Sequence, residues 1–229
     1  MLYFFILLLI LAGTALVYFS DVLDLFCANL FYQNGFYLKD NFWIEMIDLY
    51  MEYIICLLYA TVLGLWILPK LHLPDVIQNK LSFITHKISI KTNQMIYLSL
   101  CFLGACVALP YGCKIFFHRA RPYQTDIYGG ECSFTAAFEK SFCPIGDSFI
   151  SGHTSFSLWL FALALMLPKK IRTIGVVLAL GIVLFVACCR LLGGYHYLTD
   201  VAFAFLLVGS CILIIYRKIF VSESAFNQD

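Results

Sequence analysis

Residues 2–20 read LYFFILLLILAGTALVYFS and contain no charged side chain. A helix needs about 20 apolar residues to cross a bilayer, so this run predicts a membrane-spanning helix. It lacks a basic segment at its start and is long for a signal-peptide core, so we interpret it as a retained anchor. The whole chain of 229 residues is 62% hydrophobic and 13% charged, with a mean hydropathy of +0.88. Soluble domains are about 45–50% apolar and about 25% charged, so the composition excludes a soluble or a disordered protein.

Further apolar runs lie near residues 50–68, 94–114, 154–167, 173–190 and 200–216. Lipid admits only helices or closed barrels, and these runs are too long for barrel strands. We therefore predict an all-α fold with six transmembrane helices in one bundle, forming a single domain over residues 1–229. The fourth run is short, and it spans only if its helix begins inside the preceding loop or the bilayer adapts.

Basic residues are concentrated in alternate loops. Nine of the fifteen fall after spans two and four or in the C-terminal tail: Lys70, Lys80, Lys87, Lys91, Lys169, Lys170, Arg172, Arg217 and Lys218. Cytoplasmic loops carry such an excess, so we expect both termini in the cytoplasm and the loops after spans one, three and five outside. A net charge of +1 gives no field to attract nucleic acid. The expected partners are therefore membrane lipids, and the oligomeric state stays open.

The first outer loop is rich in aromatic residues, and two interpretations stay open. An aromatic belt at the headgroups is one, and a wall or lid beside an active site is the other. The residues in question are Phe31, Tyr32, Phe36, Tyr37, Phe42 and Trp43.

Charged and polar residues within or beside the spans converge on the outer face. Lys114 ends the third span, Ser151-Gly152-His153 opens the fourth, Arg190 ends the fifth and Asp200 opens the sixth. Such residues are costly in a membrane and usually mark function. Glu52 does not join them in this interpretation and receives no role.

These groups predict a site for phosphoryl transfer. Lys114, Arg121 and Arg190 suit phosphate oxygens, and Ser151 with the N–H of Gly152 adds donors at a helix start. His196 and Asp200 are four residues apart, so the carboxylate can orient the imidazole for attack, and His153 can protonate a leaving oxygen. No acidic set on this face has metal-ligand spacing, so we expect no metal and no other cofactor.

Three motifs of the chain resemble those of the type 2 phosphatidic acid phosphatase superfamily, in the same order. They are Lys114–Arg121–Pro122 in a KxxxxxxRP pattern, Ser151-Gly152-His153, and Arg190–His196–Asp200 in an RxxxxxHxxxD pattern, all within about 110–205. The resemblance implies that His196 forms a phosphohistidine, Asp200 orients it and His153 is the acid. It assigns phosphate binding to Lys114, Arg121, Ser151, Gly152 and Arg190. Ile150 and Cys189 depart from the usual Pro and Ser, which puts loop shape and one phosphate donor in doubt.

The loop 123–150 is similar to that of the bacterial lipid A phosphatase branch at Gly129-Gly130, Phe134-Thr135 and Phe138. This implies a metal-independent lipid phosphatase of the bacterial inner membrane, acting at the periplasmic face on lipid A. Undecaprenyl diphosphate and phosphatidylglycerol phosphate are alternative substrates, and a non-catalytic protein that binds or transports anionic lipid is the rival class.

Five residues in or near this loop receive no catalytic role. We expect His118 at the membrane interface and Arg119 and Lys140 in contact with headgroups. Whether Cys132 and Cys143 are bridged stays open.

Overall fold

The computed structural model describes residues 2–36, 38–71 and 90–221. Within these ranges the chain is helical, with two isolated bridges, Tyr32–Phe36 and Thr125–Cys132, and no β-strand. The predicted all-α fold is therefore confirmed for this part of the chain. Lys80, Lys87 and Tyr37, which entered the predictions above, lie outside the described residues.

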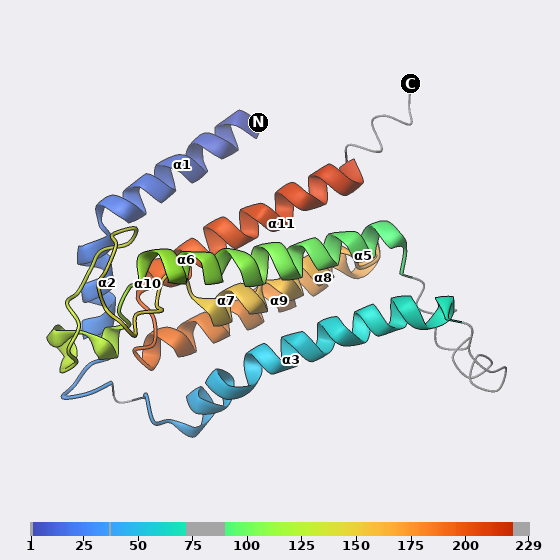
Figure 1. The fold of residues 1–229 in the computed structure, drawn as a ribbon. Coiled ribbons are helices and arrows are strands. Elements are labelled where there is room, and N and C mark those ends of the chain that lie inside the picture. Colours follow the sequence, from blue (N-terminus) through green and yellow to red (C-terminus); the bar gives the residue numbers. More distant parts are fainter. Residues whose placement is uncertain (1, 37, 72–89, 222–229) are drawn as a thin grey trace.

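The helices form two groups along the chain (Figure 1). The N-terminal group is α1 (Leu2–Tyr18), α2 (Ser20–Asn29) and α3 (Phe42–Ile67), which a 3-10 turn at Leu68–Lys70 extends. The second group begins with α5 (Thr92–Ser99), which continues through the π-helical Leu100–Ala108 into α6 (Leu109–Phe117). It goes on with α7 (Gly152–Ser157), α8 (Trp159–Leu165), α9 (Lys169–Leu192), α10 (Leu198–Phe203), Ala204–Val208, α11 (Gly209–Tyr216) and Arg217–Val221.

Four helices are long and apolar enough to cross a membrane: Phe42–Lys70, Thr92–Gln124, Lys169–Leu192 and Leu198–Val221. A bent pair, Ile10–Tyr18 with Ser20–Asn29 at 68°, makes a fifth if it counts as one broken span, and Gly152–Leu165 is a shorter apolar helix. The chain is thus a multi-pass membrane protein, with each predicted run helical. The predicted first outer loop, 21–50, is itself partly helical, because it contains α2 and the start of α3.

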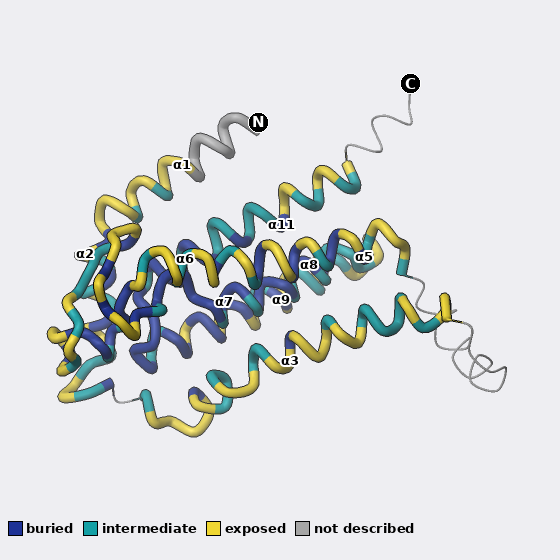
Figure 2. Tube along the Cα trace, viewed as in Figure 1, coloured by how far each residue is buried: buried dark blue, intermediate teal, exposed yellow. Residues whose placement is uncertain are grey.

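The core lies around α7 and α8, which pack against α9, α3 and the helix that contains α5. Trp159 is fully buried there, and its Nε1 donates to the carbonyl oxygen of Leu98 at 3.1 Å. Figure 2 shows this centre buried, while α3 and the part of α1 from residue 10 onward are mostly exposed or half-buried. In the most apolar stretch of α3 6% of the residues are buried, against 33–39% in the three other long helices. α3 is therefore the long helix that packs least.

Local sequence features end or start the helices at one end of the bundle. His118 has φ 47° and caps α6, and the Ser151 side chain accepts a hydrogen bond from Thr154 N to start α7. Gly194 has φ +67°, and a Cβ there would lie 2.4 Å from the Phe36 ring, so the chain after α9 requires glycine. Figure 1 shows the ends of α6 and α9 close to the starts of α7 and α10. The three motifs therefore meet at this end.

Aromatic residues of the predicted outer loop divide into two sets. Phe31, Tyr32 and Phe36 pack in a cluster with Tyr128 and Tyr197. Phe42 and Trp43, in contrast, are 59% and 71% exposed. The first set therefore forms part of the wall around the motif end, and the second faces outward at the start of α3.

Candidate active site

Two cations of the first motif converge on one carboxylate. Arg121 donates from Nε and Nη2 to the two oxygens of Asp147, each at 2.6 Å. Lys114 Nζ lies 3.8 Å from the same carboxylate. A Cβ on Gly152 would be 3.3 Å from Lys114 Nζ, so the start of α7 lies directly against this lysine. Asp147 belongs to none of the three motifs and was not predicted from the sequence.

Asp147 stays ionised in this contact. Burial alone would raise the pKa of its carboxyl, but the hydrogen bonds and charge of Arg121, with Lys114 beside it, hold that pKa below its usual value. A carboxylate that binds the two predicted phosphate ligands occupies the kind of position that a phosphate oxygen would take.

Arg190 comes from the last turn of α9, and its side chain is fully buried. Its Nη1 donates to Asp48 Oδ1 of α3 at 2.5 Å, and its guanidinium lies over the Tyr195 ring at 4.0 Å. Among the described residues, nothing accepts a hydrogen bond from its Nε or Nη2. Buried donors are almost always paired, so these two N–H groups are available for the oxygens of a ligand.

His196 is 2% exposed, and burial lowers the pKa of its imidazole to about 3, so the ring is neutral at pH 7. Asp200 Oδ2 lies 3.7 Å from His196 Nδ1, which is too far for a direct hydrogen bond. Ser148 lies between them: its Oγ donates to Asp200 Oδ2 at 2.6 Å and is 3.4 Å from Nδ1. With a proton on Nδ1, this relay leaves the lone pair of Nε2 free. Sequence reasoning missed Ser148 because it belongs to no motif.

His153 lies between two carboxylates of α3. Its Nε2 is 2.9 Å from the carbonyl oxygen of Asp48, and its Nδ1 is 3.5 Å from Glu52 Oε1. A Cβ on Gly152 would also be 3.4 Å from this Glu52 oxygen. The expectation that Glu52 stays apart from the cluster is therefore wrong. Asp48 and Glu52 are four residues apart and so share one helix face, a signal that the sequence offered.

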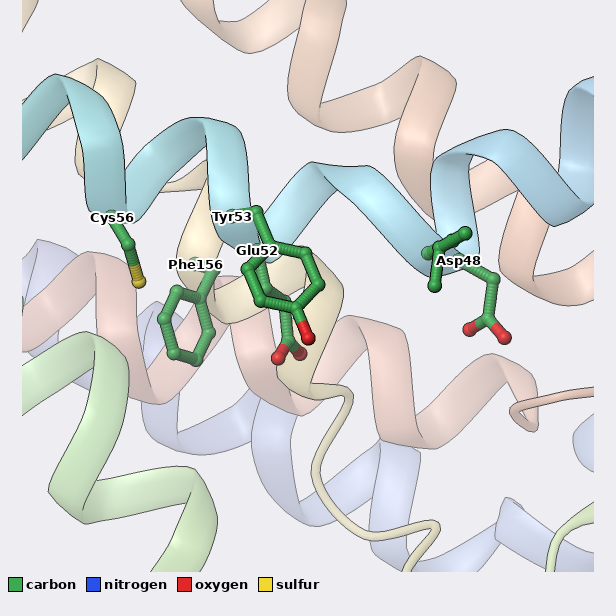
Figure 3. A pocket seen from close by; sticks show the side chains of 6 residues that line it. Asp48, Glu52, Tyr53, Cys56 and Phe156 are labelled. Carbon is green, nitrogen blue, oxygen red and sulfur yellow. The ribbon is translucent and has the colours of Figure 1, made fainter.

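A cavity of about 340 Å³ opens beside His153, lined by Asp48, Leu49, Glu52, Tyr53, Cys56 and Phe156 (Figure 3). The picture shows the carboxylate of Glu52 close to the rings of Tyr53 and Phe156. The cavity therefore combines two acidic side chains with an apolar and aromatic wall.

Ser151 is fully buried, and its hydroxyl is engaged within α7. The Oγ atom lies 2.9 Å from Thr154 Oγ1 and accepts from Thr154 N at 3.4 Å. The backbone N–H of Ser151 donates to the carbonyl oxygen of Asp200 at 3.1 Å. The second and third motifs are thus joined through their main chains, and the Ser151 hydroxyl caps the helix.

The expectation that Arg119 contacts headgroups is wrong, because its side chain is 1% exposed and lies between Asp24 and Asp200. Lys140 and His118 are exposed, and Lys140 Nζ lies 5.6 Å from the Phe116 ring. Cys132 and Cys143 form a disulfide. Among the described residues, no group of three or more His, Cys, Asp or Glu side chains is placed to hold a metal ion.

The fold and the site together define a class of protein: a multi-pass helical membrane protein with cations and two histidines clustered at one end. The family model of the PAP2 superfamily matches residues 94–223, more than half of the chain, and the protein belongs to that superfamily. It is similar to the lipid A 4'-phosphatase of Rhizobium etli, 35% identical over 111 residues that cover 48% of this chain and 42% of that protein. The lipid A 4'-phosphatase of Rhizobium leguminosarum is 31% identical over 132 residues, 57% of this chain and 55% of that protein.

The chain thus spans about half the length of these curated relatives. No solved structure matches it.

Proposed function

We propose that the protein is a lipid phosphatase that removes a phosphate from an outer-leaflet lipid, with lipid A as its substrate. The observation that carries this proposal is the buried guanidinium of Arg190, which has two N–H groups without a partner among the described residues. The positive charges of Arg190 and Arg121 help to lower the pKa of the His196 imidazole, which supports a common site for the cations and the histidine. Lipid A as the substrate is supported by the names of both relatives.

In the proposed reaction, His196 Nε2 attacks phosphorus while Lys114, Arg121 and Arg190 bind the phosphate oxygens, aided by Gly152 N–H and Ser151 at the start of α7. The N–P bond forms as the bond to the leaving oxygen breaks, and His153 gives that oxygen a proton. Water then hydrolyses the phosphohistidine, with His153 taking up the proton. Asp147 and Asp48 must release their cations when phosphate enters.

The proposed topology has six spans in one domain, with both termini in the cytoplasm of a bacterial inner membrane and the site at the periplasmic face. It is supported by the position of the motif end, opposite the end of α3, the starts of α5 and α9 and the end of the helix that contains α11 (Figure 1). Seven basic residues of the described chain lie at or beside those helix ends: Lys70, Lys91, Lys169, Lys170, Arg172, Arg217 and Lys218. The fourth span would be the α7–α8 helix, which starts in the preceding loop. A reporter after Lys218 should be active only as a cytoplasmic one, and active periplasmic fusions there would reverse the topology.

A panel of purified lipids tests the function. We expect phosphate release from lipid A to exceed release from undecaprenyl diphosphate and phosphatidylglycerol phosphate, and to persist in EDTA if the cations replace a metal. If either alternative lipid is turned over rapidly while lipid A stays unchanged, that lipid and not lipid A is the substrate. Loss of activity in EDTA that one divalent ion restores would contradict metal independence.

A matched pair of histidine variants separates catalysis from the rival binding function. His196→Asn should lower turnover by at least ~10³-fold, because it removes the attacking atom. His118→Asn should have no effect, since His118 is exposed and asparagine tolerates its left-handed conformation. Lipid binding without turnover in the wild type would favour a non-catalytic binding or transport protein.

A further inference from the structure

Arg119 links two buried carboxylates from opposite ends of the sequence. Its Nη2 donates to Asp24 Oδ2 at 2.7 Å, and its Nη1 donates to Asp200 Oδ1 at 2.6 Å. Nε donates to the carbonyl oxygen of Thr135 at 3.0 Å. All three guanidinium nitrogens are thus engaged within the protein, and the side chain is 1% exposed. Arg119 is therefore no ligand for a headgroup or a substrate phosphate.

Asp24, on α2, is fully buried and makes further contacts with the start of α10. Its Oδ1 accepts from the backbone N–H of Thr199 at 2.8 Å, and its Oδ2 accepts from the Thr199 hydroxyl at 2.6 Å. Thr199 directly precedes Asp200, so this carboxylate holds the backbone on which Asp200 is mounted.

Asp200 has each oxygen fixed by a different partner. Oδ1 accepts a hydrogen bond from Arg119 Nη1. Oδ2 accepts one from Ser148 Oγ at 2.6 Å and one from the backbone N–H of Tyr197 at 2.8 Å. Ser148 in turn contacts Nδ1 of His196. A continuous hydrogen-bonded path therefore runs from Asp24 through Arg119, Asp200 and Ser148 to the imidazole.

The charges along this path do not cancel. Two carboxylates, Asp24 and Asp200, share the one guanidinium of Arg119, so Arg119 does not neutralise both. An imidazole that attacks phosphorus through Nε2 while Nδ1 keeps its proton becomes positively charged. The carboxylate of Asp200, 3.7 Å from Nδ1, stabilises that form, and the interaction is strong because both side chains are buried.

We propose that Asp24 and Arg119 are positioning residues for catalysis, which hold Asp200 and Ser148 in place and stabilise the imidazole of His196 as it accepts the phosphoryl group. This inference rests on the proposed function. Neither residue touches the cations Lys114, Arg121 and Arg190 in any described contact. Changing Asp24 or Arg119 should therefore slow the phosphoryl-transfer step without weakening phosphate binding.

The test compares Asp24→Asn with Asp21→Asn, the same substitution on the same helix at an exposed position. Asparagine has the shape of aspartate but not its charge. We expect Asp24→Asn to lower kcat by ~10–10²-fold, with KM and the inhibition constant of vanadate changed less than ~3-fold. Asp21→Asn should match the wild type. In a single turnover, formation of the phosphoenzyme should slow by the same factor as kcat.

Arg119→Lys is the second variant, because lysine keeps the charge but cannot bridge two carboxylates. It should also reduce kcat, and the double variant Asp24→Asn/Arg119→Lys should lose less than the product of the single effects, because both act through Asp200. Multiplicative losses in that double variant would overturn the shared path.

Two further outcomes overturn the inference in different ways. If the wild type turns over lipid but Asp24→Asn matches Asp21→Asn, the inference fails and the proposed function stands. If kcat, KM, vanadate inhibition and melting temperature all worsen together, Asp24 serves folding only and the inference fails as well. A wild type that releases no phosphate from any lipid overturns the proposed function, and the inference with it.

Discussion

The N-terminal helices α1–α3 and the motif-bearing helices α5–α11 bring opposite charges to the site. Arg119, Arg190 and His153 belong to the second region, and their carboxylate neighbours Asp24, Asp48 and Glu52 belong to the first. The PAP2 model begins at residue 94, so it covers the cations and omits these counter-charges. A buried guanidinium without a partner is costly, so the motif-bearing helices depend on the N-terminal ones. The site is thus shared between the two regions.

Two of these carboxylates differ in how firmly they are held. Asp24 is fully buried and accepts three hydrogen bonds, one from Arg119 and two from the main chain and hydroxyl of Thr199. The Asp48 side chain is 37% exposed and belongs to α3, the helix that packs least. Asp24 is therefore suited to a permanent structural contact, whereas Asp48 is suited to leave Arg190 when a phosphate arrives.

The largest expected effect comes from replacing Arg190, a buried cation of the motif-bearing region. Arg190→Lys should lower kcat/KM by ~10²–10³-fold, because lysine cannot supply the planar set of donors that meets the phosphate in the transition state. Phosphate release from lipid in detergent measures it. Arg172→Lys, which exchanges an arginine bonded to Leu167 O and Tyr216 at the other end of α9, should have no such effect. Equal activity in the two variants would remove Arg190 from the phosphate site.

The spacing of the cations and of the histidine–aspartate pair is local, so the sequence alone could propose them as one site. Lys114 and Arg121 are fixed along one segment, and His196 and Asp200 follow from one helical turn. The all-α fold was predictable for a similar reason, since each uncharged run of the right length has few other structures open to it in a membrane.

The counter-charges were not predictable, because nothing local connects them to their partners. Asp24 and Arg119 are 95 positions apart, and Asp48 and Arg190 are 142 apart. Which loop acid reaches which arginine depends on how α2 and α3 pack. Arg119 was assigned to headgroups for this reason, since its position beside a span end fits both an exposed and a buried side chain.

The next effect concerns the buried histidine of the motif-bearing region. The folded protein holds His196 neutral with a pKa of about 3, below the ordinary value of 6.5. Protonation therefore favours the unfolded state, so this contribution to stability is complete above pH 6.5 and is lost as the pH falls toward 3. At pH 5 the loss is about 2 kcal/mol, or ~30-fold in the unfolding constant.

Denaturant titration in detergent at pH 7.5 and pH 5.0 measures this loss. His196→Asn should lose less stability between the two values than the wild type does, by about 2 kcal/mol. His118→Asn should behave as the wild type, because His118 is exposed. The same pH dependence in all three proteins would mean that His196 is not held neutral by burial.

A smaller effect is expected from replacing Asp48, an acidic residue of the N-terminal region. Asp48→Asn removes the carboxylate that competes with phosphate for Arg190 but keeps the carbonyl oxygen that contacts His153. Inhibition by inorganic phosphate or vanadate should tighten by ~3–10-fold, the range of a partly exposed ion pair. Glu45→Gln, which removes an exposed charge from the same helix, is the control. Inhibition equal to that of this control would show that Asp48 does not compete for Arg190, and weaker inhibition would show that Asp48 assists anion binding.

The smallest effect on catalysis concerns the disulfide loop of the motif-bearing region, where it meets α2. Cys132 and Cys143 are 11 positions apart, so their bond stabilises the folded loop by about 3 kcal/mol through the entropy of the unfolded chain. Tyr128 precedes the segment that the disulfide closes, within the loop 123–150. Its hydroxyl donates to Asn29 Oδ1 of α2 at 2.9 Å, and this contact holds the loop independently of the disulfide.

Replacing both cysteines by serine should therefore lower the melting temperature but change kcat/KM by less than ~3-fold, because Arg121 still binds Asp147 and Arg119 still binds Asp24. Mass spectrometry of a non-reduced digest should find the Cys132 and Cys143 peptides linked in the wild type. The comparison predicts that Asp24→Asn costs more activity than this double serine variant, since the carboxylate reaches His196 through hydrogen bonds and the disulfide does not. The reverse order would mean that the loop, and not α2, determines the positions of His196 and Asp200.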